Sequence, residues 1–267
     1  MLDIASFFDP KTCTFEGLFG PSDPVWQPLC DLKQYMDDQS YPPLPKDLLP
    51  DGQPLSRTVV IADGEILAAD HLRIECGDAT KGGLKVYQEA RELPGATVIM
   101  AGAVVTGSRI RLGRGVLVEA GAFIKSPAII GDQTEIRQGA YLRGHTLVGA
   151  RCVVGHVTEV KHAIFLDDAK AGHFAYLGDS VLGGNANLGA GTKLANLRFV
   201  RGEVLIKTPE GKVNSGLTKL GAILGDGVQT GCNSVTNPGT LLSRGSVVLP
   251  NTTVPSGYHA PHSVIRR

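Results

Sequence analysis

His173 is the residue of this sequence whose surroundings best suit acid–base chemistry. It follows Gly172, and Lys170 and Tyr176 flank it at a short distance along the chain. An imidazole exchanges a proton near neutral pH, so it can serve as a general acid or base. Gly172 falls where a six-residue repeat, described below, would place a core side chain. The sequence therefore predicts an irregular backbone at 170–178 and a functional role for His173.

Three cations recur at a spacing of 18 residues: Lys125, Arg143 and Lys161. If 18 residues make one coil of a solenoid, these side chains stack along one edge, about 4.8 Å apart. Like charges at that spacing repel by about 1 kcal/mol in water and by ~3–4 kcal/mol at an effective dielectric of 20. One interpretation is a solvated ladder whose long side chains diverge. The other is a phosphate site, because an anion removes the repulsion.

The elements that would position these residues follow from an aliphatic side chain at every sixth position. Helices repeat near 3.6 residues and strands near 2, so a period of six indicates short strands separated by corners, three to an 18-residue coil. The pattern predicts an all-β fold, a left-handed parallel β-helix of hexapeptide repeats. The unbroken series is Leu112, Val118, Ile124, Ile130, Ile136, Leu142, Val148, Val154, Val160 and Leu166. It resumes at Leu177, Leu182, Leu188 and Leu194, with one-residue losses on either side of Leu177. The period returns, with two threonines among its members, in Leu224, Thr230, Thr236, Leu242, Val248 and Val254.

The rest of the chain divides around this repeat. Residues 1–55 are predicted to hold a short helix from Pro24 to Met36, followed by a proline-rich linker. Residues 56–260 form the predicted β-helix, with coils starting near Val59, and residues 261–267 form a tail. Two insertions interrupt the repeat: 81–94, interpreted as a short helix, and 197–216, interpreted as a hairpin.

Composition excludes several classes of function. Lys+Arg and Asp+Glu both number 26, the pI is near 7, and no basic run appears, so neither a nucleic acid nor a membrane surface is expected as a partner. The five cysteines (Cys13, Cys30, Cys76, Cys152, Cys232) have no CxxC spacing, and Cys152 sits at a small inward position of the repeat. The start, MLDIASFF, has no basic region typical of a signal peptide, and no 18-residue apolar run occurs. A reduced, cytoplasmic protein is predicted.

Zinc is the alternative for the histidines in the coils. His156 and His162 are candidates for an interface site like that of hexapeptide carbonic anhydrases, which needs three well-placed imidazoles. Surface histidines are common and this spacing is not diagnostic, so we expect no metal.

Five segments carry a resemblance to a known family. Glu159–Lys161, the run KAGHFAYLGD at 170–179 and NANLGAGT at 185–192 resemble the acetyltransferase domain of bifunctional glucosamine-1-phosphate acetyltransferase/uridylyltransferase enzymes. Asn196–Arg198 and KLGAILGD at 219–226 resemble the archaeal-type sugar-1-phosphate members. The resemblance covers about residues 100–255. No glycine-rich nucleotide-binding loop is present, so only the acyl-transfer half is implied.

The resemblance implies an acetyl-CoA-dependent N-acetyltransferase that acts on an amino-sugar 1-phosphate, glucosamine-1-phosphate or galactosamine-1-phosphate, and assembles as a homotrimer. His173 would be the general base, with Glu159 and Asn196 orienting it or the amine. The other residues it implies bind the sugar phosphate (Arg143, Lys161 and Tyr176), the sugar (Asn187) and acetyl-CoA (Ala190 and Cys232).

The sequence departs from the archaeal-type pattern in the second insertion and on the coenzyme side. Gly202 and Leu205 stand where those members carry lysines, and Arg201 and Lys207 are possible substitutes. Pro250 replaces a small residue. Two alternatives stay open: an acyltransferase for UDP-amino sugars like those of the lipid A pathway, and a non-catalytic assembly subunit.

Overall fold

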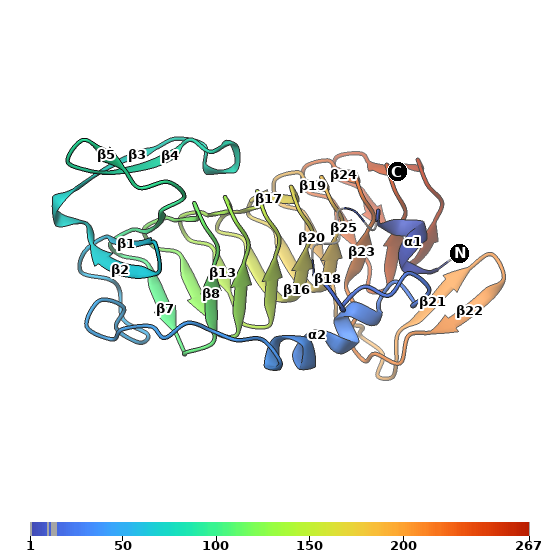
Figure 1. Ribbon diagram of the computed structural model, residues 1–267. Coiled ribbons are helices and arrows are strands. Elements are labelled where there is room, and N and C mark those ends of the chain that lie inside the picture. The colour runs from blue at the N-terminus through green and yellow to red at the C-terminus, as the bar shows by residue number, and fades with distance from the viewer. Residues whose placement is uncertain (1, 10, 12–14, 267) are drawn as a thin grey trace.

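The computed structural model describes residues 2–9, 11 and 15–266; Met1, Cys13 and Arg267 lie outside the described residues. From β6 onward, most of the described chain winds into a parallel β-helix, an elongated prism with three faces (Figure 1). The predicted fold class, a left-handed parallel β-helix with a short helical segment near the N-terminus, is confirmed.

Each face is a stack of short parallel strands, one from each coil. Face A consists of β6 (Thr97–Ile99), β9 (Leu117–Val118), β12 (Glu135–Ile136), β15 (Val153–His156), β17 (Lys170–His173), β19 (Asn187–Leu188), β24 (Gln229–Thr230), β27 (Val247–Val248) and β30 (Val264–Ile265). Face B consists of β7 (Val104–Thr106), β10 (Phe123–Lys125), β13 (Tyr141–Leu142), the first halves of β16 (Glu159–Phe165) and β18 (Tyr176–Leu182), β20 (Lys193–Leu194), β25 (Val235–Thr236) and β28 (Thr253–Val254). Face C consists of β8 (Ile110–Leu112), β11 (Ala128–Ile130), β14 (Thr146–Val148), the second halves of β16 and β18, β23 (Ala222–Leu224), β26 (Thr240–Leu242) and β29 (Gly257–His259).

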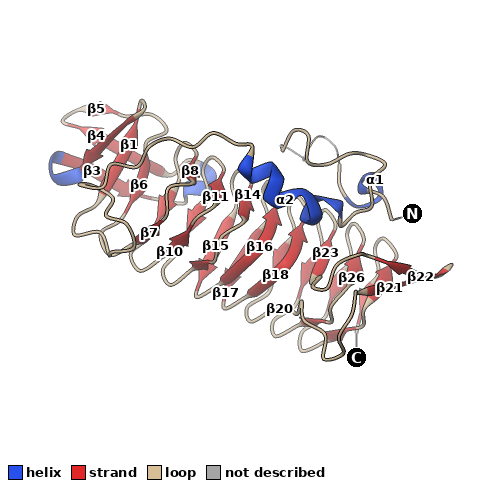
Figure 2. Cartoon of the chain, turned by 90° about the horizontal axis from the view of Figure 1, so that it is seen from below, coloured by secondary structure: helices blue, strands red, loops and turns tan. Residues whose placement is uncertain are grey.

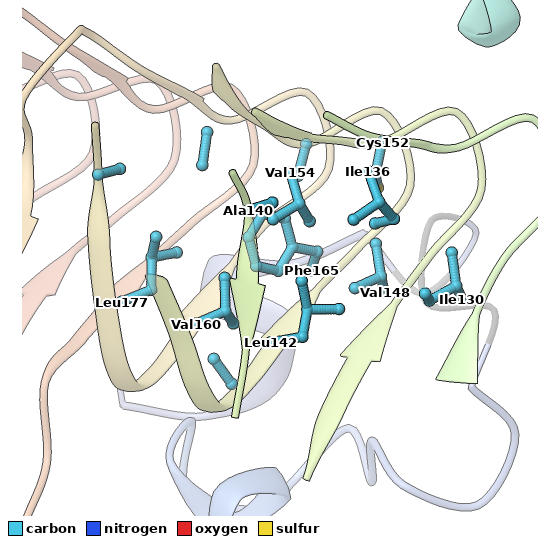
Figure 3. Packing of buried hydrophobic residues seen from close by; sticks show 14 of the residues in the cluster. Ile130, Ile136, Ala140, Leu142, Val148, Cys152, Val154, Val160, Phe165 and Leu177 are labelled. Atoms are coloured by element: carbon cyan, nitrogen blue, oxygen red, sulfur yellow. The ribbon is translucent and has the colours of Figure 1, made fainter. Parts of the chain in front are cut away.

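Aliphatic side chains from all three faces fill the interior of the prism. Figure 3 shows Ile136 and Val154 from face A, Leu142 and Val160 from face B, and Val148 from face C pointing into one core. Cys152 is fully buried in the same core, as its inward position in the repeat predicts. This packing is what holds the coils in register, since each inward residue lies against its counterparts one coil away.

The six-residue register breaks earlier than the sequence suggests. Val160 pairs with Leu142, 18 residues back, but Phe165 pairs with Val148, only 17 residues back. One residue is therefore lost at the corner between faces B and C, and Phe165 takes the core position expected for Leu166. The same shift makes Ala171, rather than Gly172, the next inward residue on face A.

The prediction of an irregular backbone at 170–178 is therefore wrong. Residues 170–173 and 176–182 are regular strands, because the shortened corner absorbs the missing residue. His173 ends strand β17 and points outward, while Ala171 packs inside.

The two ends of the prism also differ from expectation. β1 (Val59–Ala62) is antiparallel to both β2 (Glu65–Ala68) and β6, so it caps the first coil and does not start one. The expected helix at 81–94 is instead an antiparallel sheet of β3 (Leu72–Cys76), β4 (Leu84–Gln88) and β5 (Arg91–Glu92), with one 3₁₀ turn at Ala79–Lys81 before β4. At the other end, β30 pairs with β27 in parallel, so the β-helix extends into the segment that we expected to be a tail.

The hairpin expected in the second insertion is present as β21 (Leu205–Thr208) and β22 (Gly211–Asn214). It projects from the C-terminal end of the prism (Figure 1).

The N-terminal segment covers face C. It contains α1 (Ile4–Phe7) and α2 (Gln27–Asp37), and α2 crosses the outer side of β16 and β18 (Figure 2). The outward residues at the centre of face C form an apolar stripe: Ile129, Leu147, Ile164, Val181, Ile223 and Leu241. Phe7, Leu29, Leu32 and Met36 pack onto this stripe in a second core. Faces A and B carry no such helical cover in the described chain.

We expect Leu32→Ala to destabilise the protein by about 2–5 kcal/mol, because Leu32 is fully buried between α2 and face C. Urea unfolding measures the change. Gln34→Ala, an exposed change on the same helix, should alter the free energy of unfolding by less than about 0.5 kcal/mol. Equal effects of the two substitutions would contradict the packing described here.

Candidate functional site

All the candidate residues except Asn187 lie on face B and at its two corners. The A–B corner contains His173 at the end of β17, and the B–C corner contains His162 and Asp179 within β16 and β18. Between the corners, Glu159 and Tyr176 are paired neighbours on the outer side of face B. A strand of three residues spans about 10 Å, and this length separates the two corners within one chain.

The predicted ladder of cations exists as a stack of neighbours. Leu142 pairs with Ile124 on one side and Val160 on the other, so the residues that follow them, Lys125, Arg143 and Lys161, lie on successive coils. Two of the three have carboxylate partners. Arg143 Nη1 lies 2.6 Å from Glu159 Oε1, and Lys161 Nζ lies 3.4 Å from Asp179 Oδ2. These carboxylates offset part of the repulsion expected from the cations alone.

Asp179 is the centre of a hydrogen-bonded network at the B–C corner. In an earlier coil two residues, Gly144 and His145, turn the chain at this corner, whereas Asp179 turns it alone. His162 does the same one coil before Asp179, and both residues have positive φ, 48° for His162 and 46° for Asp179. His162 Nδ1 lies 3.0 Å from Asp179 Oδ1, and Asn196 Nδ2 donates to Asp179 Oδ2 at 2.5 Å. Burial alone would raise the pKa of Asp179, but hydrogen bonds from His162 and Asn196 and the charge of Lys161 outweigh it, so the pKa lies below its ordinary range.

Tyr176 is tied to the same network. Its hydroxyl donates to Asn196 Oδ1 at 3.3 Å, and burial followed by the charges of Glu159 and Asp179 raises its pKa. Gly178 makes this contact possible, because a Cβ there would meet Asn196 Nδ2 and would lie 2.6 Å from the Tyr176 oxygen. Asn196 is therefore positioned by Tyr176 and Asp179.

A cavity of about 410 Å³ opens beside the B–C corner. Its lining includes Arg143 and Lys161 and two further cations, Lys33 of α2 and Lys219 after the second insertion. Asp179 is the one carboxylate in that lining. Lys219 was not among the predicted site residues, although it stands directly before the apolar run where the coils resume. Lys207, suggested there as a substitute, lines a different pocket beside the hairpin.

The A–B corner brings the predicted base and the predicted coenzyme residues onto one line. The pairing of β17, β19 and β24 continues past their ends, so His173, Ala190 and Cys232 occupy equivalent positions on three successive coils. Backbone hydrogen bonds fix this stacking: Gly191 N donates to His173 O at 3.0 Å, and Asn233 N donates to Ala190 O at 2.8 Å. His173 is exposed and stacks on His156 of the preceding coil, with ring centroids 5.8 Å apart.

Two sets of residues that were predicted to act together are not in contact within one chain. Glu159 is held by Arg143 and Asn196 by Tyr176 and Asp179, so both engage partners other than His173. Asn187 begins β19 on face A, where it pairs with Lys170, and so it lies around the A–B corner from Tyr176.

The histidines of the zinc alternative are separated as well. His156 ends a strand of face A at the A–B corner, whereas His162 stands at the B–C corner. Among the described residues, no three His, Cys, Asp or Glu side chains are grouped so that they could hold a metal ion.

Comparison with known proteins identifies the family. The GMPPB C-terminal domain matches residues 124–265, just over half of the 267 residues, and this stretch contains the site described above apart from the residues of α2 that line the cavity. The chain belongs to the GMPPB C-terminal domain family.

Curated relatives support the resemblance noted in the sequence. A bifunctional sugar-1-phosphate nucleotidylyltransferase/acetyltransferase of Sulfurisphaera tokodaii is 36% identical over 155 residues, which cover 51% of this chain and 39% of that protein. The bifunctional protein GlmU of Methanocaldococcus jannaschii is 40% identical over 100 residues, or 38% of this chain and 24% of that protein. The predicted resemblance is confirmed, and the chain spans less than two fifths of the length of these relatives.

Solved structures with hexapeptide folds are more distant. A perosamine N-acetyltransferase mutant of Caulobacter crescentus, in complex with CoA and GDP-perosamine, is 23% identical with a TM-score of 0.28, covering 60% of this chain and 50% of that one. A UDP-N-acetylglucosamine acyltransferase of Campylobacter jejuni is 17% identical with a TM-score of 0.38, covering 61% and 69%. At these TM-scores neither likeness bears on the function of this family member.

The helices of this family member are short. Within the described residues, none has the length and apolar character needed to cross a membrane.

We expect Asp179→Asn to destabilise the protein by about 1.5–3 kcal/mol near neutral pH, because a charged acceptor of hydrogen bonds is lost. Asparagine also tolerates the positive φ at this position. The pKa of Asp179 is lowered in the folded state, so its contribution is complete above the ordinary aspartate range and is lost as pH falls through the lower folded value. The difference in unfolding free energy between parent and variant should therefore shrink below about pH 4. A difference that does not change between pH 7 and pH 2 would contradict the network.

Proposed function

We propose that this chain transfers the acetyl group of acetyl-CoA to the amino group of an amino-sugar 1-phosphate, either glucosamine-1-phosphate or galactosamine-1-phosphate. The observation that carries the proposal is the arrangement of face B. A cationic cavity lies at one corner and an exposed histidine, in line with Ala190 and Cys232, at the other. In a hexosamine 1-phosphate the amine and the phosphate stand on neighbouring carbons, so the phosphate must bind on the side of the cavity nearest His173, within reach of the long side chains of Arg143 and Lys161.

The donor lies along the A–B corner. Among the described residues the amide of Ala190 makes no backbone hydrogen bond, so it is available to the carbonyl oxygen of a thioester. Cys232, one coil further, is exposed beside the same line and would contact the rest of the coenzyme. The relatives that are named acetyltransferases support acetyl-CoA as the donor.

The acceptor crosses face B. Its phosphate lies in the cavity with Arg143, Lys161 and Lys219, and its ring lies over Tyr176 and Glu159. The amine nitrogen attacks the thioester carbon, the C–S bond breaks, and the coenzyme leaves as its thiolate. His173 accepts the proton released by the amine and can return it to the sulfur, so no acyl-enzyme is needed.

We propose a homotrimer in which face A of one copy meets face B of the next. Asn187 on face A could then reach the sugar held on face B of a neighbouring copy. Sedimentation equilibrium should give about three times the 28.1 kDa chain mass at micromolar concentration. If the protein is a monomer under these conditions, Asn187 is not part of the site. A cytoplasmic location stays a prediction.

Thiol release from acetyl-CoA tests the function directly. The parent protein is offered glucosamine-1-phosphate, galactosamine-1-phosphate, glucosamine, UDP-glucosamine and a buffer blank. Release that requires an amino-sugar 1-phosphate supports the proposal. Release only with UDP-glucosamine favours the UDP-amino-sugar alternative, and no release with any acceptor favours an assembly subunit.

We expect Arg143→Ala to raise the KM for the sugar phosphate about tenfold or more, because a charged contact to phosphate is lost. The free energy of unfolding should change little, since the Arg143–Glu159 pair is half exposed. Lys125→Ala is the matched control: it removes another cation of the ladder, but Lys125 does not line the cavity. An unchanged KM in Arg143→Ala would favour the interpretation of the three cations as a solvated ladder without a role in phosphate binding.

We expect His173→Ala to lower kcat by roughly 10²–10⁴ with little change in melting temperature, because the side chain is exposed and acts as the base. Binding of acetyl-CoA should persist. His156→Ala removes the stacked neighbour and should keep most of the turnover. If His173→Ala retains parental turnover, or if it unfolds, His173 is not the base.

A further inference from the structure

Helix α2 covers face C, and it also reaches the cationic cavity. Leu29 and Lys33 are four positions apart along the helix, so they project from the same side of it. Leu29 is 1% exposed in the core between α2 and face C, and both residues line the cavity. The packing of Leu29 therefore fixes the point from which the flexible stem of Lys33 extends to the cavity edge.

The charges around the cavity are unequal. Arg143 is paired with Glu159 and Lys161 with Asp179. In the described part of the chain, neither Lys33 nor Lys219 has a carboxylate within ion-pair distance, although both line the same cavity as the paired cations. Two ammonium groups thus face the cavity without a neutralising partner, and a bound anion would supply one.

His145 gives a second sign that Lys33 faces this corner. His145 stands on the coil before His162 and lines the same cavity. Its pKa is lowered by burial first, and then by the charges of His162, Lys33 and Arg109, with Asp37 opposing them. The positive charge of Lys33 therefore lies close enough to the cavity wall to contribute to lowering the pKa of His145.

We infer that Lys33 of the N-terminal helix binds the phosphate of the acceptor, an inference that rests on the proposed function for the identity of that acceptor. A phosphate monoester carries nearly two charges at neutral pH. A fourth cation at the cavity favours such a terminal monoester over a sugar linked to a nucleotide, whose bridging phosphates carry one charge each. The N-terminal segment is then part of the substrate site and contributes to its choice of acceptor.

The test compares Lys33→Gln and Lys33→Arg with the parent. Lys85→Gln is the matched control, since Lys85 is an exposed lysine on β4 at the far end of the prism. Steady-state kinetics give KM and kcat for glucosamine-1-phosphate and for unphosphorylated glucosamine. Isothermal titration with inorganic phosphate measures anion binding without turnover.

Lys33→Gln should raise the KM for glucosamine-1-phosphate and the Kd for inorganic phosphate about 5- to 20-fold, a smaller effect than at Arg143 because Lys33 is exposed and screened. The kcat and the KM values for glucosamine and acetyl-CoA should stay within twofold. Lys33→Arg should restore phosphate affinity, and Lys85→Gln should match the parent.

The outcomes separate this inference from the proposed function. Unchanged phosphate affinity in Lys33→Gln, or failure of Lys33→Arg to restore it, overturns the inference even if the protein is an active acetyltransferase. If the parent shows no acetyl transfer but Lys33→Gln binds phosphate more weakly than the parent does, the anion site is supported and the proposed function is rejected.

Discussion

Backbone hydrogen bonds between successive coils determine where every functional side chain stands. The pairing of β17 with β19 and of β19 with β24 places His173, Ala190 and Cys232 in one line, although they are distant along the chain. The approach of the coils is close: a Cβ at Gly155 would meet the backbone oxygen of Gly172. Because the stacking tolerates so little displacement, a change of one residue in coil length must appear at a corner, and the strands stay regular.

The B–C corner is where that change occurs, and it creates the polar network of the site. Shortening the corner leaves a single residue, first His162 and then Asp179, to turn the chain, and both adopt the left-handed region. Such a conformation has an energetic cost for residues other than glycine. The contacts of Asp179 with His162, Lys161 and Asn196 offset this cost, and they also hold the cations beside the cavity. Strain and electrostatics are therefore coupled at the same corner.

The repeat made much of the architecture predictable. Its period predicted the strands and faces, and the 18-residue spacing predicted the stack of Lys125, Arg143 and Lys161. The apolar run before the turn residues at 208–211 predicted the hairpin. The position of the lost residue was not predictable, because Phe165 and Leu166 are both apolar and either could fill the core. The second core was missed for a similar reason. Outward residues such as Ile164 and Val181 lie next to inward ones in the same strands, and only the docked helix distinguishes them.

The covering of face C has a consequence for how a complete site can form. Face C is occupied by the chain's own N-terminal segment, and the first coils of face A are covered by the β3–β5 sheet. A neighbouring copy can therefore approach only face B and the rest of face A without displacing a buried core. These two faces meet at the A–B corner, where His173 and Ala190 lie. The B–C corner, in contrast, borders α2 of the same chain, and Lys33 and Leu29 line its cavity. The phosphate of the proposed acceptor would therefore be held within a single chain, and the amine on the neighbouring carbon would face the side where copies meet. Because α2 is anchored by Leu29, Leu32 and Met36, the position of the phosphate would depend on the same apolar packing that stabilises face C.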